Sequence, residues 1–417
     1  MVGAGKTIWL VYYAAMPPKY EVRIQTLKRA QYLREFGFKV FIIGGSFLHN
    51  TDINLIHDKT PYQFVEYEGG HSFIHIRTNN YKGNGIDRIK NLVTFYFRLW
   101  WYSSKFEKPD YMSHIASVPF SNIIYFIAKK FKAKFIVDVV DLWPESFVAY
   151  GLIAKKNLLL KFAYWAEYWL YKKADILIFS MEGGKDYIKE KGWSIEQGGK
   201  VNLDKVFYIN NGVDLHDFDH NQLHFKIDDS DLENERVFRV IYVGSIRLAN
   251  NIKQLIEAAE LLKDLPNMQF LIYGDGEERE YLENYCLEKK LSNVVFKQRW
   301  VELKFIPYIL SKSSLNILNY KNSGVLRFGG SQSKSFQYMA SGKPICANVS
   351  MSYCPINQFN IGIAKEFQNP FEYAEAIKSI YDLNADAYLH ICSNAREASK
   401  LYDYKSLTKK FVHLLMN

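Results

Sequence analysis

The stretch GGSQSKSFQYMASGKP, residues 329–344, joins small polar residues and a lysine to an amphipathic segment of helical period. A phosphate group binds free backbone N–H groups at the positive end of a helix dipole. Ser333 and Lys334, at the expected start of this helix, are therefore candidate phosphate ligands. The alternative is an ordinary surface helix capped by Ser331 or Ser333. The elements around the stretch must decide between these interpretations.

A second glycine-containing sequence, GAGKT, occupies residues 3–7. It resembles the end of a P-loop, but it lacks the first glycine of that motif. It also precedes an expected strand, whereas a P-loop follows a strand and opens a helix. We expect this segment to be disordered and to have no ATPase role.

The composition limits the possible classes of protein. The 417 residues are 48% hydrophobic and 16% aromatic, enough for a large core in two or three domains at the usual size of ~150 residues. No apolar run reaches the roughly 18 residues of a membrane span, and no secretory signal is recognised. The four cysteines lack CxxC spacing, which predicts free thiols in a reducing cytoplasm and no metal or disulfide framework.

The formal net charge of +9 permits a nucleic acid, an anionic membrane surface or an anionic substrate as partner. No zinc-finger or RNP-like motif supports nucleic acid binding. Two segments, 86–108 and 155–173, mix basic residues with aromatic ones, including Trp100, Trp101, Trp165 and Trp169. Such helices suit a membrane interface. In the alternative interpretation, the aromatic residues belong to the core and the lysines are solvated.

Apolar and amphipathic segments alternate along the chain. The first half has expected strands at 7–15, 38–45, 110–117, 133–141, 174–180 and 205–214, with helices at 22–37 and 121–131. The pattern restarts with strands at 238–245 and 268–276, helices at 251–264 and 277–290, and three further strands. This alternation predicts parallel sheets with helices on both faces.

The fold class predicted is α/β, with two doubly wound Rossmann-like domains facing a cleft. We expect an N-terminal domain at 1–214, a polar linker at 215–235 and a C-terminal domain at 236–390, with a helix in 391–417 returning to the first domain. Ligands of such sheets bind at the carboxyl ends of the strands.

Five motifs in order resemble those of bacterial glycosyltransferase family 4, a retaining class with the GT-B fold. The resemblance covers nearly the whole length. The motifs are DVVDLWPES (138–146), YINNGVDLHDF (208–218), YVGSIRLANNIKQLIEAAELL (242–262), LIYGDGEEREYLE (271–283) and SKSFQYMASGKPI (333–345). Members of the capsule and O-antigen type are the most similar. The resemblance implies an acceptor-binding first domain and a second domain that binds the nucleotide sugar.

The resemblance assigns candidate donor-binding residues to the second domain. Glycines end two strands where backbone must approach the nucleotide closely, and basic side chains clamp its diphosphate. The positions that match are Gly244, Arg247, Lys253, Gly274, Gly276, Ser333, Lys334 and Gln337. The lysine that the family often carries near Asn250 and Asn251 is missing here.

Two glutamates typical of the family are also replaced. Gln337 stands where a glutamate binds the ribose hydroxyls, and Gly329 stands eight residues earlier, where a second glutamate contacts the sugar. Glutamine still donates and accepts hydrogen bonds, but it loses the charge-assisted bond, a loss of about 1–2 kcal/mol.

In the first half, Asp141 and Glu145 are the candidate catalytic residues. Asp141 follows a strand, where a carboxylate can bind sugar hydroxyls or stabilise developing positive charge, although it can also cap the next helix. Glu145 is a candidate acceptor base or sugar ligand. Arg23, in the first loop, matches a position that contacts phosphate in this group, or it flanks the helix.

The function implied is transfer of a hexosyl or N-acetylhexosaminyl group from a nucleoside-diphosphate sugar, UDP first and GDP second, in surface polysaccharide synthesis such as capsule or lipopolysaccharide. The implied acceptor is a glycan on a polyprenyl-diphosphate lipid. The resemblance implies no metal or other cofactor, no nucleic acid partner, and a cytoplasmic protein held at the anionic surface of the inner membrane. The alternatives are a nucleotide-sugar 2-epimerase of the same fold and a non-catalytic glycan-binding or scaffold relative.

Overall fold

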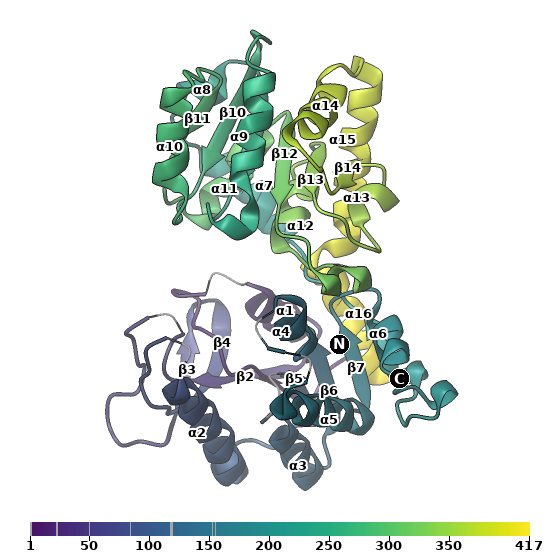
Figure 1. Cartoon of the computed structure of the whole chain (residues 1–417). Helices are drawn as coiled ribbons and strands as arrows, with labels where there is room; N and C mark the ends of the chain where they lie inside the picture. Colours follow the sequence, from purple (N-terminus) through teal and green to yellow (C-terminus); the bar gives the residue numbers. More distant parts are fainter. Residues whose placement is uncertain are drawn as a thin grey trace. The chain divides into compact units, whose positions relative to one another are not determined.

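The structure is a computed structural model that describes residues 2–21, 24–49, 51–83, 85–116, 120–151, 153–154 and 156–417. Contacts between Cα atoms divide the chain into two compact units (Figure 1). The first unit comprises residues 1–210 and 404–417, and the second comprises residues 211–403. Arg23, a candidate phosphate ligand, lies outside the described residues.

The first unit is built on a mostly parallel sheet of eight strands, counted over the described residues, in the order β3-β4-β2-β1-β5-β6-β7-β8. Only β3 pairs antiparallel among these described strands. The bounds are β1 (Thr7–Val11), β2 (Lys39–Gly45), β3 (Tyr62–Tyr67), β4 (His71–Ile76), β5 (Tyr111–Ile115), β6 (Lys134–Val139), β7 (Ile176–Phe179) and β8 (Val206–Tyr208). The β3–β4 hairpin was not expected, because β3 is largely exposed and has no buried apolar run.

Helices cover both faces of this sheet, because successive strand residues point to opposite sides. Ile8 and Leu10 pack with α1 (Gln25–Glu35) and α16 (Tyr404–Met416). Trp9 points the other way and packs edge-on against Phe131 of α3. That face carries α2 (Ile86–Tyr102), α3 (Asn122–Phe131) and α5 (Leu158–Lys173). The shorter helices are α4 (Glu145–Ala149) and α6 (Gly184–Glu190).

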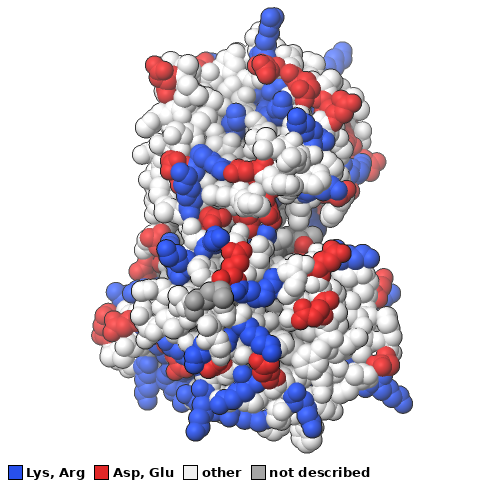
Figure 2. Space-filling model, turned by 180° about the vertical axis from the view of Figure 1, so that it is seen from behind, with Lys and Arg blue, Asp and Glu red and all other residues white. Residues whose placement is uncertain are grey.

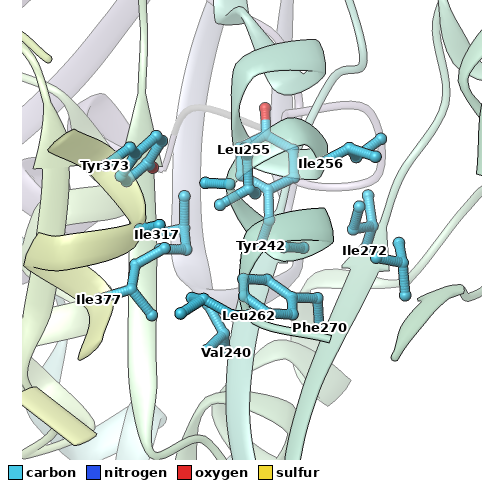
Figure 3. Packing of buried hydrophobic residues seen from close by; sticks show 14 of the residues in the cluster. Val240, Tyr242, Leu255, Ile256, Leu262, Phe270, Ile272, Ile317, Tyr373 and Ile377 are labelled. Carbon is cyan, nitrogen blue, oxygen red and sulfur yellow. The ribbon is translucent and has the colours of Figure 1, made fainter. Parts of the chain in front are cut away.

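The second unit has a parallel sheet in the order β11-β10-β9-β12-β13-β14. Its strands are β9 (Phe238–Val243), β10 (Met268–Tyr273), β11 (Val294–Phe296), β12 (Leu315–Asn319), β13 (Ile345–Asn348) and β14 (Gly362–Lys365). The helices are α7 (Leu215–His224), α8 (Ser230–Glu233), α9 (Ile252–Leu261), α10 (Arg279–Glu288), α11 (Ile306–Ser311), α12 (Ser333–Ala340), α13 (Pro355–Gln358), α14 (Pro370–Tyr381) and α15 (Ala385–Ser399). Figure 3 shows side chains of β9, β10, β12, α9 and α14 meeting in one buried cluster.

Two parallel-sheet units of this kind confirm the predicted α/β fold class. The segment 215–235, expected to be a polar linker, contains α7 and α8 and lies inside the second unit. Its polar composition reflects short helices with one buried residue each, Phe218 and Leu232. The expected helix in 391–417 is two helices: α15 ends in the second unit, whereas α16 lies in the first and packs on α1.

The segment 3–6 is an ordered turn, so the expectation of disorder was wrong. The Gly3 amide donates to the Phe36 carbonyl at 2.9 Å, and a Cβ at Gly3 would lie 2.3 Å from the Phe38 ring. Gly3 therefore allows the Phe38 ring to pack closely against the backbone. Within the described residues, no helix combines the length and the hydropathy needed to cross a bilayer.

Candidate functional site

The candidate site of the second unit lies at the carboxyl ends of β9 and β10. β9 lies between β10 and β12, so the chain departs in opposite directions on its two sides, and this is where open parallel sheets bind ligands. The loops after β9 and β10 run side by side. The Gly244 amide donates to the Tyr273 carbonyl at 3.0 Å, and the Ile246 amide donates to the Asp275 carbonyl at 2.8 Å.

This close approach requires glycine at three of the predicted positions. Gly244, Gly274 and Gly276 have φ values of 156°, 128° and 159°, which L side chains rarely adopt. A Cβ at Gly274 would lie 1.8 Å from the Gly244 carbonyl oxygen, and one at Gly276 would lie 2.2 Å from the Ile246 carbonyl oxygen. The structure thus brings these three glycines together.

Lys334 extends from α12 to the same place. A Cβ at Gly244 would lie 1.8 Å from its Nζ, which sits 5.0 Å from the centre of the Tyr242 ring. The side chain is half-buried, and the loss of solvent lowers the pKa of its ammonium to about 8. No hydrogen bond or ion pair reaches it from the described residues. A desolvated cation without a counter-charge is costly, so this site favours an anionic ligand.

The first turn of α12 supplies further donors. Gln332 is the N-cap residue and forms no side-chain cap. In this turn, the Ser335 amide donates to the Gln332 carbonyl at 3.1 Å. The amides of Ser333 and Lys334 have no acceptor in the described part of the chain. Ser333 itself is exposed. The alternative of a helix capped by Ser331 or Ser333 is therefore not found, and the helix end is open to an anion.

The two other predicted basic residues each have a carboxylate partner. Arg247 is exposed, with its Nε 3.8 Å from a carboxylate oxygen of Glu277. Lys253 bonds to Glu257 at 2.9 Å, the interaction that raises the pKa of Lys253, and lies over the Tyr285 ring of α10. The structure therefore places the Lys253 ammonium between α9 and α10.

Gln337 and Gly329, the two positions where the resemblance led us to expect glutamate, differ in their surroundings. Gln337 lies one turn after Lys334 on α12 and is half-buried; its side-chain amide has no hydrogen bond to any described residue. Gly329 has φ 93° and ψ −178°, a conformation that only glycine adopts readily. A glutamate at position 329 would therefore require a different backbone conformation.

Sequence reasoning missed two residues that hold this loop in place. The Tyr242 hydroxyl donates to the Ser245 carbonyl at 2.7 Å. Asn250 Nδ2 donates to the Tyr242 hydroxyl at 3.1 Å and to Ser245 Oγ at 2.9 Å. The Tyr242 hydroxyl thus holds the loop after β9 in place, and the Tyr242 ring contacts the Lys334 ammonium. The only feature of the sequence that could have indicated this role was the pair Asn250 and Asn251, which stands where the glycosyltransferases that the chain resembles often have a lysine.

Asp141 and Glu145 of the first unit have different environments. Asp141 follows β6, as predicted, and is exposed. The N-cap residue of α4 is Pro144 and not Asp141. Asp141 therefore stays a candidate for contact with a ligand.

Glu145 is buried and engaged by its own unit. One carboxylate oxygen accepts from Lys191 Nζ and from the Tyr164 hydroxyl, both at 2.5 Å. The Lys191 ammonium also lies 4.3 Å from the centre of the Tyr164 ring. This geometry indicates that Glu145 anchors the loop carrying Asp141, and it does not favour the predicted role as an acceptor base.

One group among the described residues has the ligand types for a metal ion: Asp214, His216 and Asp217 at the start of α7. Asp214 is the N-cap of that helix and accepts from the Asp217 amide at 2.9 Å. Its carboxylate therefore already has a structural role, and the cluster gives no independent sign of a metal.

Residues 225–398 match the family described as "Glycosyl transferases group 1". No match was found among curated protein sequences. Solved structures with a similar fold include a glycosyltransferase from Rickettsia africae, with 17% identity, a TM-score of 0.62 and coverage of 98% of this chain and 97% of that one.

A sucrose-phosphate synthase from Thermosynechococcus elongatus is 17% identical, with a TM-score of 0.69 and 98% of each chain covered. HepE from Anabaena, in complex with UDP, is 13% identical, with a TM-score of 0.65 and 98% of each chain covered. The chain thus carries a group 1 glycosyltransferase domain and has the fold of GT-B glycosyltransferases, which supports the prediction of a glycosyltransferase enzyme.

Substitution of Glu145 tests its anchoring role. Glu145→Ala leaves Lys191 half-buried without its carboxylate, which should lower the free energy of unfolding by about 3–5 kcal/mol. Glu182→Ala, at an exposed position, should change it by less than about 0.5 kcal/mol. Both values come from urea denaturation. A Glu145→Ala protein of unchanged stability would contradict the anchoring role.

Lys334 makes the stability of the ligand-free protein depend on pH. Its pKa of about 8 lies below the 10.5 of an unfolded lysine, so the native state bears the full desolvation cost below pH 8. Lys334→Met should therefore raise the melting temperature at pH 7, and this gain should shrink between pH 8 and pH 10.5. Thermal melts across this range measure it; a gain independent of pH would show that the ammonium is well solvated.

Proposed function

We propose that this chain transfers a sugar from a nucleoside-diphosphate sugar to a glycan acceptor, with retention of the anomeric configuration. The observation that carries the proposal is the half-buried Lys334 ammonium, which lies over Gly244 without an anionic partner among the described residues. The group 1 glycosyltransferase domain spans this region, and one structure of similar fold was determined with UDP.

In the proposed complex, the donor diphosphate lies between the Gly244 loop and the start of α12. The Lys334 ammonium and the amides of Ser333 and Lys334 bind its oxygens, and Arg247 closes on it from the loop. The bond between the anomeric carbon and the diphosphate oxygen breaks while an acceptor oxygen bonds to that carbon. A phosphate oxygen of the leaving group takes the acceptor proton. These cationic and amide groups stabilise the leaving diphosphate, so we expect no metal requirement.

The nucleoside end is assigned to Gln337, whose free side-chain amide can exchange hydrogen bonds with the ribose hydroxyls. UDP is our first choice of nucleotide and GDP our second. We place the acceptor on the first unit, where Asp141 contacts sugar hydroxyls. The acceptor we propose is a glycan on a polyprenyl-diphosphate lipid, and the process is surface polysaccharide synthesis at the cytoplasmic side of the inner membrane.

The conformation of Gly329 favours a second candidate function, a non-catalytic glycan-binding relative. Position 329 has no side chain with which to contact a donor sugar, and its φ of 93° excludes a simple return to glutamate. Such a relative would bind the nucleotide but release no nucleoside diphosphate from a donor sugar when membranes supply the acceptor. Nucleotide release under these conditions therefore separates the two functions.

Calorimetry with UDP and GDP at pH 7 tests the donor site. We expect one of the two nucleotides to bind, and Lys334→Met to weaken its affinity by about 1.5–3 kcal/mol, the range for a hydrogen bond to a charged group. Lys343→Met, just beyond the other end of α12, is the matched control and should change affinity by less than about 0.5 kcal/mol. Equal affinities of the two variants would remove Lys334 from the site.

A further inference from the structure

A line of large apolar side chains on α2 points into solvent. The residues follow each other at helical spacing on one face: Ile86, Ile89, Val93, Phe97, Trp100 and Trp101. Trp101 is 61% exposed, and its ring stacks on that of Phe97 with 6.1 Å between centroids. The opposite face of α2 buries Phe95, Tyr96 and Leu99 against the sheet. The helix is therefore apolar on both faces, although only one of them has a partner in the described chain.

The same exposure continues over α3 and α5. Phe126 of α3 is exposed, as are Leu158, Leu159, Phe162 and Trp165 of α5; Leu158 reaches 77%. The three helices lie side by side on one face of the sheet (Figure 1). Trp169 of α5 packs against Phe126 at 5.7 Å between centroids, and Lys130 of α3 bonds to Ser103 just after α2 at 3.3 Å. The exposed residues of the three helices thus form one continuous surface, the α2–α3–α5 surface.

The charge of this surface has one sign. The three helices carry eight basic residues, Arg88, Lys90, Arg98, Lys129, Lys130, Lys161, Lys172 and Lys173. Their acidic residues are only Asp87, which pairs with Lys90, and Glu167, which is fully buried. Figure 2, which views the molecule from the side opposite to Figure 1, shows lysine and arginine side chains along the lower end of the first unit.

Exposed apolar area of this extent usually marks a contact surface. We propose that the α2–α3–α5 surface docks on an anionic lipid bilayer, with Phe97, Trp101 and Trp165 entering the headgroup region and the lysines contacting lipid phosphates. Aromatic rings match the apolar region of a bilayer, and the basic side chains among them match its negatively charged headgroups. A protein partner of complementary charge would have to present acidic and apolar groups together, as a membrane surface does throughout.

The structure revises which residues of the basic, aromatic segments 86–108 and 155–173 belong to the exposed surface. Trp169 is half-buried against Tyr125 and Phe126. Arg98 donates to the Arg77 carbonyl at 2.6 Å and is partly buried. Both residues therefore support the surface from within. Phe126, Lys129 and Lys130, which lie outside the two segments, join it instead.

This inference rests on the proposed function for its purpose, because a lipid-linked acceptor brings the enzyme to a bilayer. Its test does not depend on catalysis. We measure co-sedimentation with vesicles of phosphatidylcholine alone and with added phosphatidylglycerol, at low and high salt. The protein should bind the anionic vesicles reversibly, and salt should weaken the binding because it screens the lysines.

Two pairs of variants localise the contact. Phe97→Ser/Trp101→Ser and, separately, Lys129→Glu/Lys130→Glu should each weaken vesicle binding by about tenfold or more. The controls change the same chemistry elsewhere. Leu223→Ser/Leu287→Ser alters exposed leucines of α7 and α10, and Lys409→Glu/Lys410→Glu alters an exposed pair on α16, on the other face of the sheet. Both controls should stay within about twofold of the wild type.

Three results would overturn the inference: no binding to anionic vesicles at low salt, equal losses in the α3 and α16 lysine variants, or self-association that Phe97→Ser/Trp101→Ser abolishes, which would make a second copy the partner. Nucleotide binding, measured without vesicles, keeps the two proposals apart. A protein that binds UDP or GDP but no vesicles contradicts only the membrane surface, and one that binds vesicles but neither nucleotide contradicts only the proposed function.

Discussion

The central feature of the second unit is a lysine ammonium that is partly removed from water and has no anionic partner among the described residues. Lys334 rests on the Tyr242 ring and against the Cα of Gly244, and this crowding is possible because the loops after β9 and β10 touch through glycine backbone. A diphosphate at this point would restore the missing counter-charge and accept the two open amides of α12. Under the proposed function, a donor diphosphate would offset the desolvation cost of this ammonium.

The first unit shows a different arrangement, since two of its buried carboxylates, Glu145 and Asp138, each pair with a basic side chain. Glu145 is neutralised by Lys191, and Asp138 of β6 accepts from Arg29 of α1 at 2.8 Å and from Ser113 of β5 at 2.6 Å. These pairs fasten the loop after β6 and the helix α1 to the sheet. Large apolar side chains of this unit are exposed on the α2–α3–α5 surface. In our proposals, the second unit binds the anionic donor, and the first unit docks on the bilayer that holds a lipid-linked acceptor.

The alternation of apolar strands and amphipathic helices was sufficient to predict two parallel α/β sheets, and the glycines and Lys334 could be placed at one strand end from motif spacing. The sequence could not reveal that Glu145 is paired, because Lys191 lies 46 positions away and neither residue belongs to a shared local pattern. The β3–β4 hairpin was not predicted, because β3 is an exposed edge strand of the sheet and has no buried apolar run. Helices α7 and α8 were predicted to be a linker, because each buries only one apolar side chain and their sequence is therefore mostly polar.

The most direct test of the central claim is a crystal structure of the chain with the nucleoside diphosphate that it binds. The account predicts a diphosphate oxygen within hydrogen-bond distance of Lys334 Nζ, with another at the first amides of α12 and the ribose beside Gln337. A nucleotide bound elsewhere, with the Lys334 ammonium still without an anion, would contradict it.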